Sequence, residues 1–279
     1  MPSASADPAT LLSANPALEA RLTRHGPMLY FAHDAYIGAS LREYGEFSEL
    51  EFDMLRQLLR PGDIVVEAGA NIGALTIPIA RAVGATGAVY AIEAQRRVFQ
   101  VLCANVALSG LPHVRTLHAA ATATGSPLQV PELDYAAPNN FGGISLVTGG
   151  AGETVQPLAI DSLELAACRM IKADVEGMEH DVLESARATV ARCRPLLYVE
   201  NDRRDKSPAL LELIHSYGYR MWWHAPPLYN PANFAANPVN LMQSIVSLNL
   251  ICVPLEINFQ FEGGQEVAGP QDFPEIGNA

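Results

Sequence analysis

The chain has 279 residues, of which 49% are hydrophobic and 17% are charged, so it is long enough for one large domain and too apolar to be disordered. Its 18 basic and 30 acidic residues give a formal net charge of −12. This charge disfavours a nucleic-acid partner, because binding to a phosphate backbone depends on excess basic charge. A small polar molecule is therefore the expected partner.

Cysteine usage and apolar runs bear on the compartment. The four cysteines are far apart and form no CxxC pair, so neither a clustered zinc site nor a redox dithiol is indicated. The opening MPSASADPATLLSANPALEARL has no basic segment followed by a long apolar core, as a secretory signal would. The late stretch SIVSLNLICVPL is too short and too polar to span a bilayer. We therefore expect a soluble, cytoplasmic protein without a membrane partner.

The two ends differ from the middle of the chain. Residues up to about Gly26 are rich in Ala, Ser and Pro and predict a short helix or a loose arm. The tail from Gly263 onward has several Gly and Pro breakers and predicts little order. We therefore divide the chain into an N-terminal arm and covering segment (1–47), a main domain (48–262) and a flexible tail (263–279).

Between these ends, apolar strands alternate with amphipathic helices. The predicted strands are 64–66, 88–92, 114–117, 170–175, 196–199 and 219–223. The predicted helices are one opened by a capping box at 48–51, then 72–83, 96–108, 178–190 and 208–217. This alternation predicts an α/β fold with a doubly wound, mostly parallel seven-stranded sheet. In such sheets, ligands bind beyond the carboxyl ends of the strands.

A glycine-bearing turn, Glu67-Ala68-Gly69-Ala70-Asn71-Ile72-Gly73, follows the first predicted strand. Its GxxxG spacing is neither the GxGxxG of dinucleotide-binding folds nor a P-loop, so it does not indicate a pyrophosphate. Glu93 ends the second strand, where doubly wound folds place an acid on a ribose. These pieces suit S-adenosylmethionine, although the glycines alone also fit a plain turn and Glu93 a solvated strand end.

Several sequence blocks, in this order, resemble the FkbM-type methyltransferases within the class I S-adenosylmethionine-dependent group. The resemblance runs from about Tyr44 to about Tyr219. The blocks are YGEFSELEF, PGDIVVEAGANIGALTIPIA, VYAIEAQRRVFQVLCANVAL, NNFGGISL, Asp161-Ser162-Leu163, IKADVEGMEHDVL and RPLLYVEN. The resemblance implies a Rossmann-like fold and S-adenosylmethionine as the cofactor.

The resemblance also implies which residues bind the cofactor. Glu93 would bind the ribose, and Glu67, where many relatives have Asp, would lie near the methionine end. The expected cofactor-binding set is Glu46, Ser48, Glu67, Gly69, Asn71, Gly73, Glu93, Ala120 and Asp174. Within this set, Glu46 and Ser48 are expected to fold over the cofactor together with Tyr44.

Polar side chains follow two neighbouring predicted strands, since Asp174 ends one and Glu200-Asn201 ends the next. Such oxygen ligands suit Mg²⁺ or Ca²⁺, and the pattern is similar to that of catechol-type O-methyltransferases, whose metal activates a hydroxyl. Those enzymes carry a lysine three residues after the first acid, where this chain has Gly177. We therefore hypothesise a metal held by Asp174, Glu200 and Asn201, with Asp174 also catalytic. The alternative is that Asp174 caps the next helix.

Further candidates lie in loops. His224, within WWHAPPLYNPANF, is a candidate catalytic base, and a hydrogen-bonded histidine in a packed aromatic loop is the alternative. Asn140 and Gly142-Gly143 either shape a substrate mouth or form a plain turn. Arg203-Arg204 either attracts an anionic substrate or is a solvated pair.

The sequence thus predicts an S-adenosylmethionine-dependent methyltransferase that methylates a hydroxyl of a small polar natural product or sugar, assisted by a divalent cation. The alternatives are a metal-independent N-methyltransferase, an NAD-dependent oxidoreductase, which the missing GxGxxG disfavours, and a non-catalytic binding module. The acceptor and the oligomeric state stay open, and a homodimer is compatible with the sequence.

Overall fold

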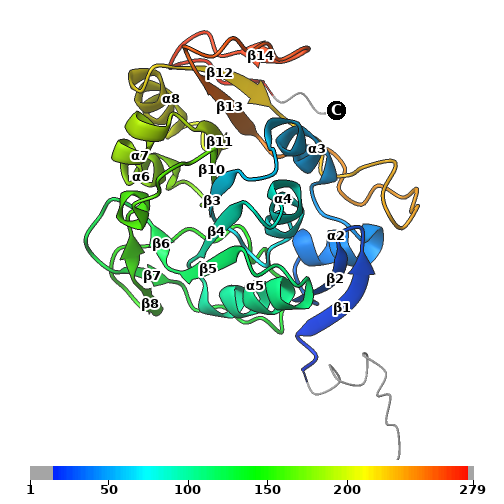
Figure 1. Cartoon of the computed structure of the whole chain (residues 1–279). Coiled ribbons are helices and arrows are strands. Elements are labelled where there is room, and N and C mark those ends of the chain that lie inside the picture. Colours follow the sequence, from blue (N-terminus) through cyan, green and yellow to red (C-terminus); the bar gives the residue numbers. More distant parts are fainter. Residues whose placement is uncertain (1–14, 276–279) are drawn as a thin grey trace, which may run out of the picture.

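The computed structural model describes residues 15–275, which are built around one large sheet (Figure 1). Its strands are β3 (Ile64–Ala68), β4 (Ala88–Glu93), β5 (Val114–His118), β10 (Met170–Ala173), β11 (Leu196–Glu200), β12 (Tyr219–His224), β13 (Asn249–Pro254) and β14 (Gln265–Glu266). They lie in the order β14-β12-β13-β11-β10-β3-β4-β5. The strands from β11 to β5 in this order are parallel, β13 is antiparallel to both of its neighbours, and β14 is antiparallel to β12.

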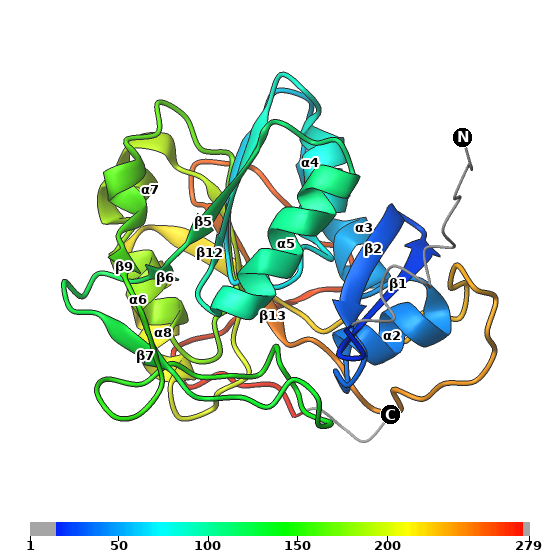
Figure 2. The same cartoon turned by 90° about the horizontal axis from the view of Figure 1, so that it is seen from below.

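Helices cover both faces of the sheet (Figure 2). One layer holds α3 (Glu49–Leu58), α4 (Thr76–Val83) and α5 (Arg96–Leu108), and the other holds α6 (Glu179–Glu184), α7 (Arg187–Cys193) and α8 (Ser207–Ser216). Val65 and Val66 point to opposite faces of β3, yet both are fully buried under these layers. Burial on both faces explains why β3 is uniformly apolar. The predicted doubly wound α/β sheet is confirmed, with eight strands in place of seven.

The topology opens a crevice between two neighbouring strands. The chain leaves β3 toward the layer of α4 and leaves β10 toward the layer of α6, although β3 and β10 are hydrogen-bonded neighbours. Loops that diverge in this way leave room for a ligand beyond the carboxyl ends of the strands. The functional site is therefore expected between the ends of β3 and β10.

The N-terminal part differs from its prediction. The chain forms a hairpin of β1 (Leu18–Thr23) and β2 (Gly26–Phe31), followed by α2 (Ile37–Tyr44). A helix or loose arm up to Gly26 is therefore wrong for residues 18–26. The run LEARLT alternates with the two-residue period of a strand, and Met28 and Tyr30 of β2 are buried in a cluster that includes side chains of α5. Residues 1–14 lie outside the described residues.

The C-terminal part also needs correction. The apolar stretch near the end, for which no strand was predicted, is β13, and all six of its residues are buried. The tail predicted to have little order contributes β14, and Phe273 packs edge-on against Trp223 with the ring centroids 5.6 Å apart. Residues 276–279 lie outside the described residues, and the proposed domain boundaries stay predictions.

Two helices differ from their predicted boundaries. The helix predicted over 178–190 is broken into α6 and α7, because the amides of Ala188 and Thr189 donate to the Asp161 carboxylate (2.8 and 2.7 Å) and start a new helix there. The helix predicted from residue 72 begins at Thr76, after a turn in which Asn71 has a φ of 50°. The remaining short elements are β6 (Ala120–Ala121), β7 (Leu128–Val130), β8 (Glu153–Val155), β9 (Pro157–Leu158) and η1 (Ile160–Leu163).

The length and apolar character of the helices in residues 15–275 bear on membrane insertion. In that range, none of the helices has both the length and the apolar run that crossing a bilayer requires.

Candidate active site

A cavity of about 510 Å³ lies at the carboxyl ends of the parallel strands. Its floor comes from the last residues of β3, β4, β10 and β11 and from the residues that follow them, including Glu67, Gly69, Asn71, Glu93, Lys172, Asp174, Glu176, Glu200, Asp202 and Arg203. Its cover comes from Tyr36, Ile37 and Phe47, from the loop that contains Asn140, Gly142 and Gly143, and from Leu228, Ile245, Val246 and Ser247. The cavity therefore occupies the place where the fold predicts a ligand.

The turn after β3 requires glycine at position 69. Gly69 has a φ of +82°, and a Cβ there would lie 1.8 Å from the carbonyl oxygen of Asp174. The loops after β3 and β10 therefore touch at a point where no side chain fits. Gly73, expected at the cofactor, is instead a packing residue outside the cavity lining. A Cβ at Gly73 would lie 2.9 Å from Cδ1 of Leu102 on α5.

Glu93 lies at the end of β4 with its carboxylate turned to the same turn. It is 5% exposed and accepts hydrogen bonds from the amides of Asn71 (2.9 Å) and Gln95 (2.7 Å). Burial raises the pKa of Glu93 to about 7, against the lowering effect of these amides. A carboxylate held by backbone in this position can accept hydrogen bonds from the hydroxyls of a ribose. The geometry thus fits the role expected of Glu93.

Glu67 and Lys172 lie side by side at the cavity floor. Glu67 is 1% exposed and accepts a hydrogen bond from the Thr76 hydroxyl (2.6 Å), and burial raises its pKa to about 7. Lys172 sits opposite Glu67 in the register of β3 and β10, and its Nζ lies 3.1 Å from Oδ2 of Asp174. Lys172 is not among the site residues predicted from the sequence. A lysine within a strand that is otherwise apolar was the signal that could have found it.

Three carboxylates converge beside the ends of β10 and β11. Oxygens of Asp174, Glu176 and Glu200 all lie within 4.8 Å of one another. Oε2 of Glu200 is buried and has no hydrogen-bond partner within residues 15–275. Burial, together with the negative charges of Asp174 and Glu176, raises the pKa of Glu200 to about 11. A bound positive charge would therefore stabilise the ionised form of this cluster.

Asn201, expected as the third ligand beside Asp174 and Glu200, is not part of this cluster. It is buried, its side-chain amide donates to the Ser207 hydroxyl (2.9 Å), and it does not line the cavity. Glu176 takes the expected place because its left-handed backbone (φ 57°) turns the DVEG loop back toward β11. The capping role considered for Asp174 is not observed, because the N-cap of α6 is Met178 and no side chain caps it within residues 15–275. Oε1 of Glu179 instead accepts the amides of Val175 and Gly177 (both 3.0 Å) and so holds the loop that precedes α6.

His224 is not placed as a catalytic base. It ends β12 outside the cavity lining, with Nδ1 2.8 Å from the hydroxyl of buried Tyr198 and its ring edge-on to Phe261. Burial lowers the pKa of His224 to about 4, so the ring is neutral at pH 7. Its surroundings agree with the alternative given in the sequence analysis, a hydrogen-bonded histidine packed among aromatic rings.

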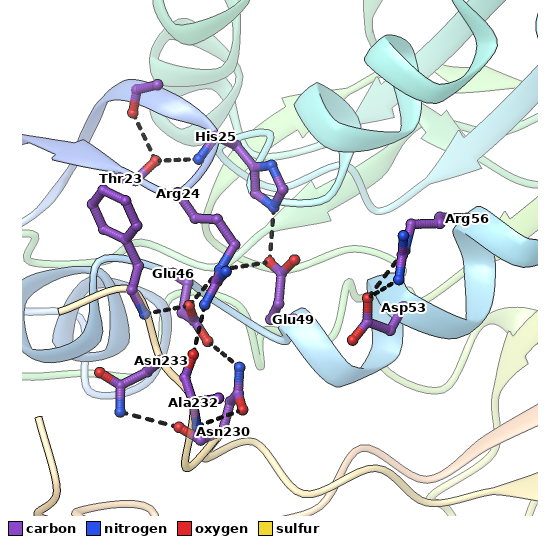
Figure 3. A network of polar contacts seen from close by, with 12 residues as sticks. Thr23, Arg24, His25, Glu46, Glu49, Asp53, Arg56, Asn230, Ala232 and Asn233 are labelled. Atoms are coloured by element: carbon purple, nitrogen blue, oxygen red, sulfur yellow. Dashed lines mark hydrogen bonds and ion pairs between the residues drawn. The ribbon is translucent and has the colours of Figure 1, made fainter. Parts of the chain in front are cut away.

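Glu46 and Ser48 do not line the cavity either. Figure 3 shows Glu46 in a network that joins three segments. Its buried carboxylate accepts hydrogen bonds from Nε of Arg24 (2.7 Å), Nδ2 of Asn230 (2.8 Å) and the amide of Phe234 (2.7 Å). Glu46 thus fastens residues 225–248, which we call the roof loop, to the β1–β2 hairpin.

Tyr44 supports the roof loop in the same way. Its hydroxyl donates to the carbonyl of Val239 (3.0 Å) and accepts from the amide of Leu241 (2.7 Å). Four residues of the roof loop line the cavity, so these contacts set how the cavity is covered. Ser48 donates to Oε2 of Glu51 (2.7 Å) and has left-handed backbone, so the predicted capping box does not form.

Of the other candidates, Ala120, Asn140, Gly142 and Gly143 line the cavity. Arg203 also lines it and is paired with Glu176. By contrast, the Arg204 guanidinium lies over the ring of Phe273, 4.6 Å from its centroid. One arginine of the pair therefore faces the site and the other packs on the tail.

A doubly wound sheet with a glycine turn after β3 and a buried acid at the end of β4 is the arrangement expected of a class I S-adenosylmethionine-dependent methyltransferase. Residues 67–221, more than half of the chain, match the family model described as the methyltransferase FkbM domain. The chain belongs to this family. The resemblance seen in the sequence is thereby confirmed, and the NAD-dependent oxidoreductase and the non-catalytic module are set aside. No curated protein matches the chain.

Solved structures with a similar fold include a methyltransferase FkbM from Methylobacillus flagellatus, with 16% identity and a TM-score of 0.46 over 73% of this chain. The match spans half (50%) of that chain. A SAM-dependent O-methyltransferase from Thermotoga maritima has 13% identity and a TM-score of 0.47 over 88% of this chain and 80% of its own. An rRNA methylase from Streptococcus thermophilus has 13% identity and a TM-score of 0.42 over 74% and 93%. These likenesses concern the fold alone.

The role of Glu93 predicts a pH dependence of cofactor binding. A ribose hydroxyl donates to an ionised carboxylate more strongly than to a protonated one, and the pKa of Glu93 is about 7. The affinity for S-adenosylhomocysteine is therefore expected to fall by roughly tenfold as the pH drops from 8 to 5.5. In Glu93→Gln, the affinity at pH 8 is expected to be already lower and the fall much shallower. Calorimetric titration at several pH values measures both, and parallel curves for the two proteins would contradict this role.

Proposed function

We propose that this methyltransferase moves the methyl group of S-adenosylmethionine to a hydroxyl oxygen of a small polar acceptor, a natural product or a sugar, with help from a divalent cation. The main support for this proposal is the cluster of three carboxylates formed by Asp174, Glu176 and Glu200. It lies in the same cavity as the cofactor-binding turn, where the acceptor must approach the methyl group.

The residues of this cluster fit a hard cation. All three offer carboxylate oxygens, which are the ligands that Mg²⁺ and Ca²⁺ prefer. Within residues 15–275, Oε2 of Glu200 is a buried acceptor without a partner, which a cation would satisfy. Burial and the negative charges of Asp174 and Glu176 raise the pKa of Glu200. Asp174, Glu176 and Glu200 are therefore the residues that would hold the ion.

The reaction is an in-line displacement, so its rate depends on holding oxygen, methyl carbon and sulfur in one line. Glu93 and the Gly69 turn hold the nucleoside, and the apolar roof residues Leu228, Ile245 and Val246 exclude water from the transfer. A bound divalent cation supplies Lewis-acid activation of an acceptor hydroxyl. Residue 177, where the catechol-type O-methyltransferases carry a lysine, is glycine, so no lysine at this position activates the acceptor.

The acceptor is proposed to be a small molecule because of the charge of the cavity. Six acidic side chains line it, Glu67, Glu93, Asp174, Glu176, Glu200 and Asp202, against two cations, Lys172 and Arg203. A nucleic-acid backbone would meet repulsion there. A neutral hydroxyl, or an amine in the case of N-methylation, would not.

Removal of metal ions tests the proposal. Turnover is followed as formation of S-adenosylhomocysteine with a panel of hydroxyl and amine acceptors. With hydroxyl acceptors we expect turnover to be lost in excess EDTA and restored by Mg²⁺. Unchanged turnover in EDTA would remove the metal from the mechanism. Turnover restricted to amines would replace O-methylation by N-methylation.

Binding of the metal can be tested without an acceptor. Millimolar Mg²⁺ is expected to raise the melting temperature by roughly 3 °C, because a ligand that binds only the folded state stabilises it. Glu200→Gln is expected to lose this shift. Glu184→Gln, which alters a partly exposed carboxylate on α6 that is paired with Arg187, serves as the matched control and should keep it.

A further inference from the structure

Lys172 is the only lysine that lines the described cavity, and it is surrounded by carboxylates. Its side chain is 2% exposed, with Nζ 3.1 Å from Oδ2 of Asp174 and 3.8 Å from Oε1 of Glu51. Glu67 faces it from the neighbouring strand. Burial alone would lower the pKa of Lys172, but the charges of Asp174, Glu51 and Glu67 raise it above its ordinary value. One ammonium group therefore faces three carboxylates.

The remaining negative charge is not balanced within residues 15–275. Glu51 has no ion-pair partner there other than Lys172, and Glu67 has none within 4 Å. Their hydrogen bonds come from neutral hydroxyls, those of Ser48 and Ser247 to Glu51 and that of Thr76 to Glu67. Buried carboxylates without a counterion are costly and attract a cation. The floor between β3 and β10 thus favours a positively charged ligand.

The topology shows which part of the cofactor meets this floor. Glu93 takes the ribose at the end of β4, and Ala120 and Ala121 line the cavity beyond it. The cofactor then has to cross the Gly69 turn of β3 to reach the acceptor at β10 and β11. Its sulfur therefore passes over the strands that carry Glu67, Lys172 and Asp174.

Methyl transfer changes the charge of the sulfur atom of the cofactor. The bond from sulfur to the methyl carbon breaks, and its electron pair stays on sulfur. The acceptor oxygen bonds to the methyl group, and its proton passes to water. A cationic sulfonium becomes a neutral thioether, while the rest of the cofactor is unchanged. A site with unbalanced negative charge loses an attraction at that moment.

We infer that Glu51 and Glu67, whose charges Lys172 does not balance, make this site prefer the cationic donor S-adenosylmethionine to its neutral product S-adenosylhomocysteine. Glu67 lines the cavity, whereas Glu51 does not and acts through Lys172. Glu51 is thus a residue that tunes cofactor selectivity from outside the cavity. The preference favours product exchange, because the neutral product binds more weakly than the S-adenosylmethionine that replaces it.

Calorimetric titration tests the inference without an acceptor. The probes are S-adenosylhomocysteine and sinefungin, an unreactive analogue with an ammonium group near the position of the sulfonium. The measured quantity is the Kd of S-adenosylhomocysteine divided by the Kd of sinefungin, at pH 8 and in EDTA so that no divalent cation adds charge. In the unaltered protein we expect a ratio of roughly ten or more.

Glu51→Gln is expected to lower this ratio by at least about threefold, and Glu67→Gln by a similar or larger factor. A variant that only loosened the pocket would weaken both probes alike and leave the ratio unchanged. The matched control is Glu49→Gln, two residues away on α3, whose carboxylate pairs with His25 outside the cavity and should keep the ratio.

A ratio at or below one in the unaltered protein overturns the inference, as does a ratio that both variants leave unchanged. Should Glu51→Gln fail to fold, Glu67→Gln decides the matter. None of these outcomes bears on O-methylation or on the metal, because neither an acceptor nor a cation is present. Loss of all binding of both probes would instead contradict the cofactor assignment itself.

Discussion

Gly69→Ala is expected to lower the free energy of unfolding by roughly 3 kcal/mol or more and to abolish binding of S-adenosylhomocysteine. Gly69 has a φ of +82°, which strains any other residue, and its added Cβ would lie 1.8 Å from the carbonyl oxygen of Asp174. That neighbour is backbone, so it can yield only if the loops after β3 and β10 separate. These two loops form the floor of the cavity, so the same shift disrupts the cofactor site.

Denaturant unfolding and calorimetric titration measure the two effects. Gly110→Ala is the matched control, because Gly110 also has a positive φ (+62°) but a Cβ there meets nothing within 4 Å. The control isolates the backbone strain, which costs about 1 kcal/mol, from the clash. Equal losses of stability in the two variants would show that the approach of Asp174 does not restrict position 69.

Asp174→Asn is expected to slow methyl transfer by roughly 100-fold or more while the affinity for S-adenosylhomocysteine changes by less than about threefold. Asp174 belongs to the carboxylate cluster with Glu176 and Glu200 and lines the cavity where the acceptor oxygen has to lie. In the proposed function, its charge acts on the acceptor or its cation, whereas the ribose is assigned to Glu93. The substitution should therefore separate catalysis from cofactor binding.

Single-turnover rates and calorimetry give the two numbers. Asp174 also pairs with Lys172, so a melting curve must accompany them, and a fall in stability alone would leave the rate at full occupancy unchanged. Asp205→Asn, an exposed acid just after β11, is the control and should behave like the unaltered protein. A rate within threefold of normal for Asp174→Asn would contradict a catalytic role.

The central sheet was predictable because its signals are local. Each parallel strand is a short apolar run, and its turn residues follow directly, so Gly69, Glu93 and Asp174 could be placed at strand ends from the sequence. Parallel strands bring those ends to one edge, which is why residues far apart in the chain were expected to meet. The same logic found Glu200 but joined it with its chain neighbour Asn201, whereas Glu176, from the loop after β10, lies beside it in the structure.

The cover of the cavity was not predictable in this way. Glu46 and His224 were assigned to the site, but both make contacts to distant segments that keep them out of it, Glu46 with Asn230 and His224 with Tyr198. Gly73 has the spacing of a cofactor glycine but serves the packing of α5. Lys172 looked like part of an ordinary strand, although its burial among carboxylates makes it a component of the site.

The sequence by itself determined the α/β sheet, the methyltransferase family and the residues at the strand ends, because apolar periodicity and turn chemistry act over a few neighbouring residues. The tertiary structure alone decided which side chains reach the cavity, how the roof loop is held and how the buried charges are balanced. These depend on contacts between segments distant in the chain, such as Arg24, Glu46 and Phe234, whose energies no local pattern encodes.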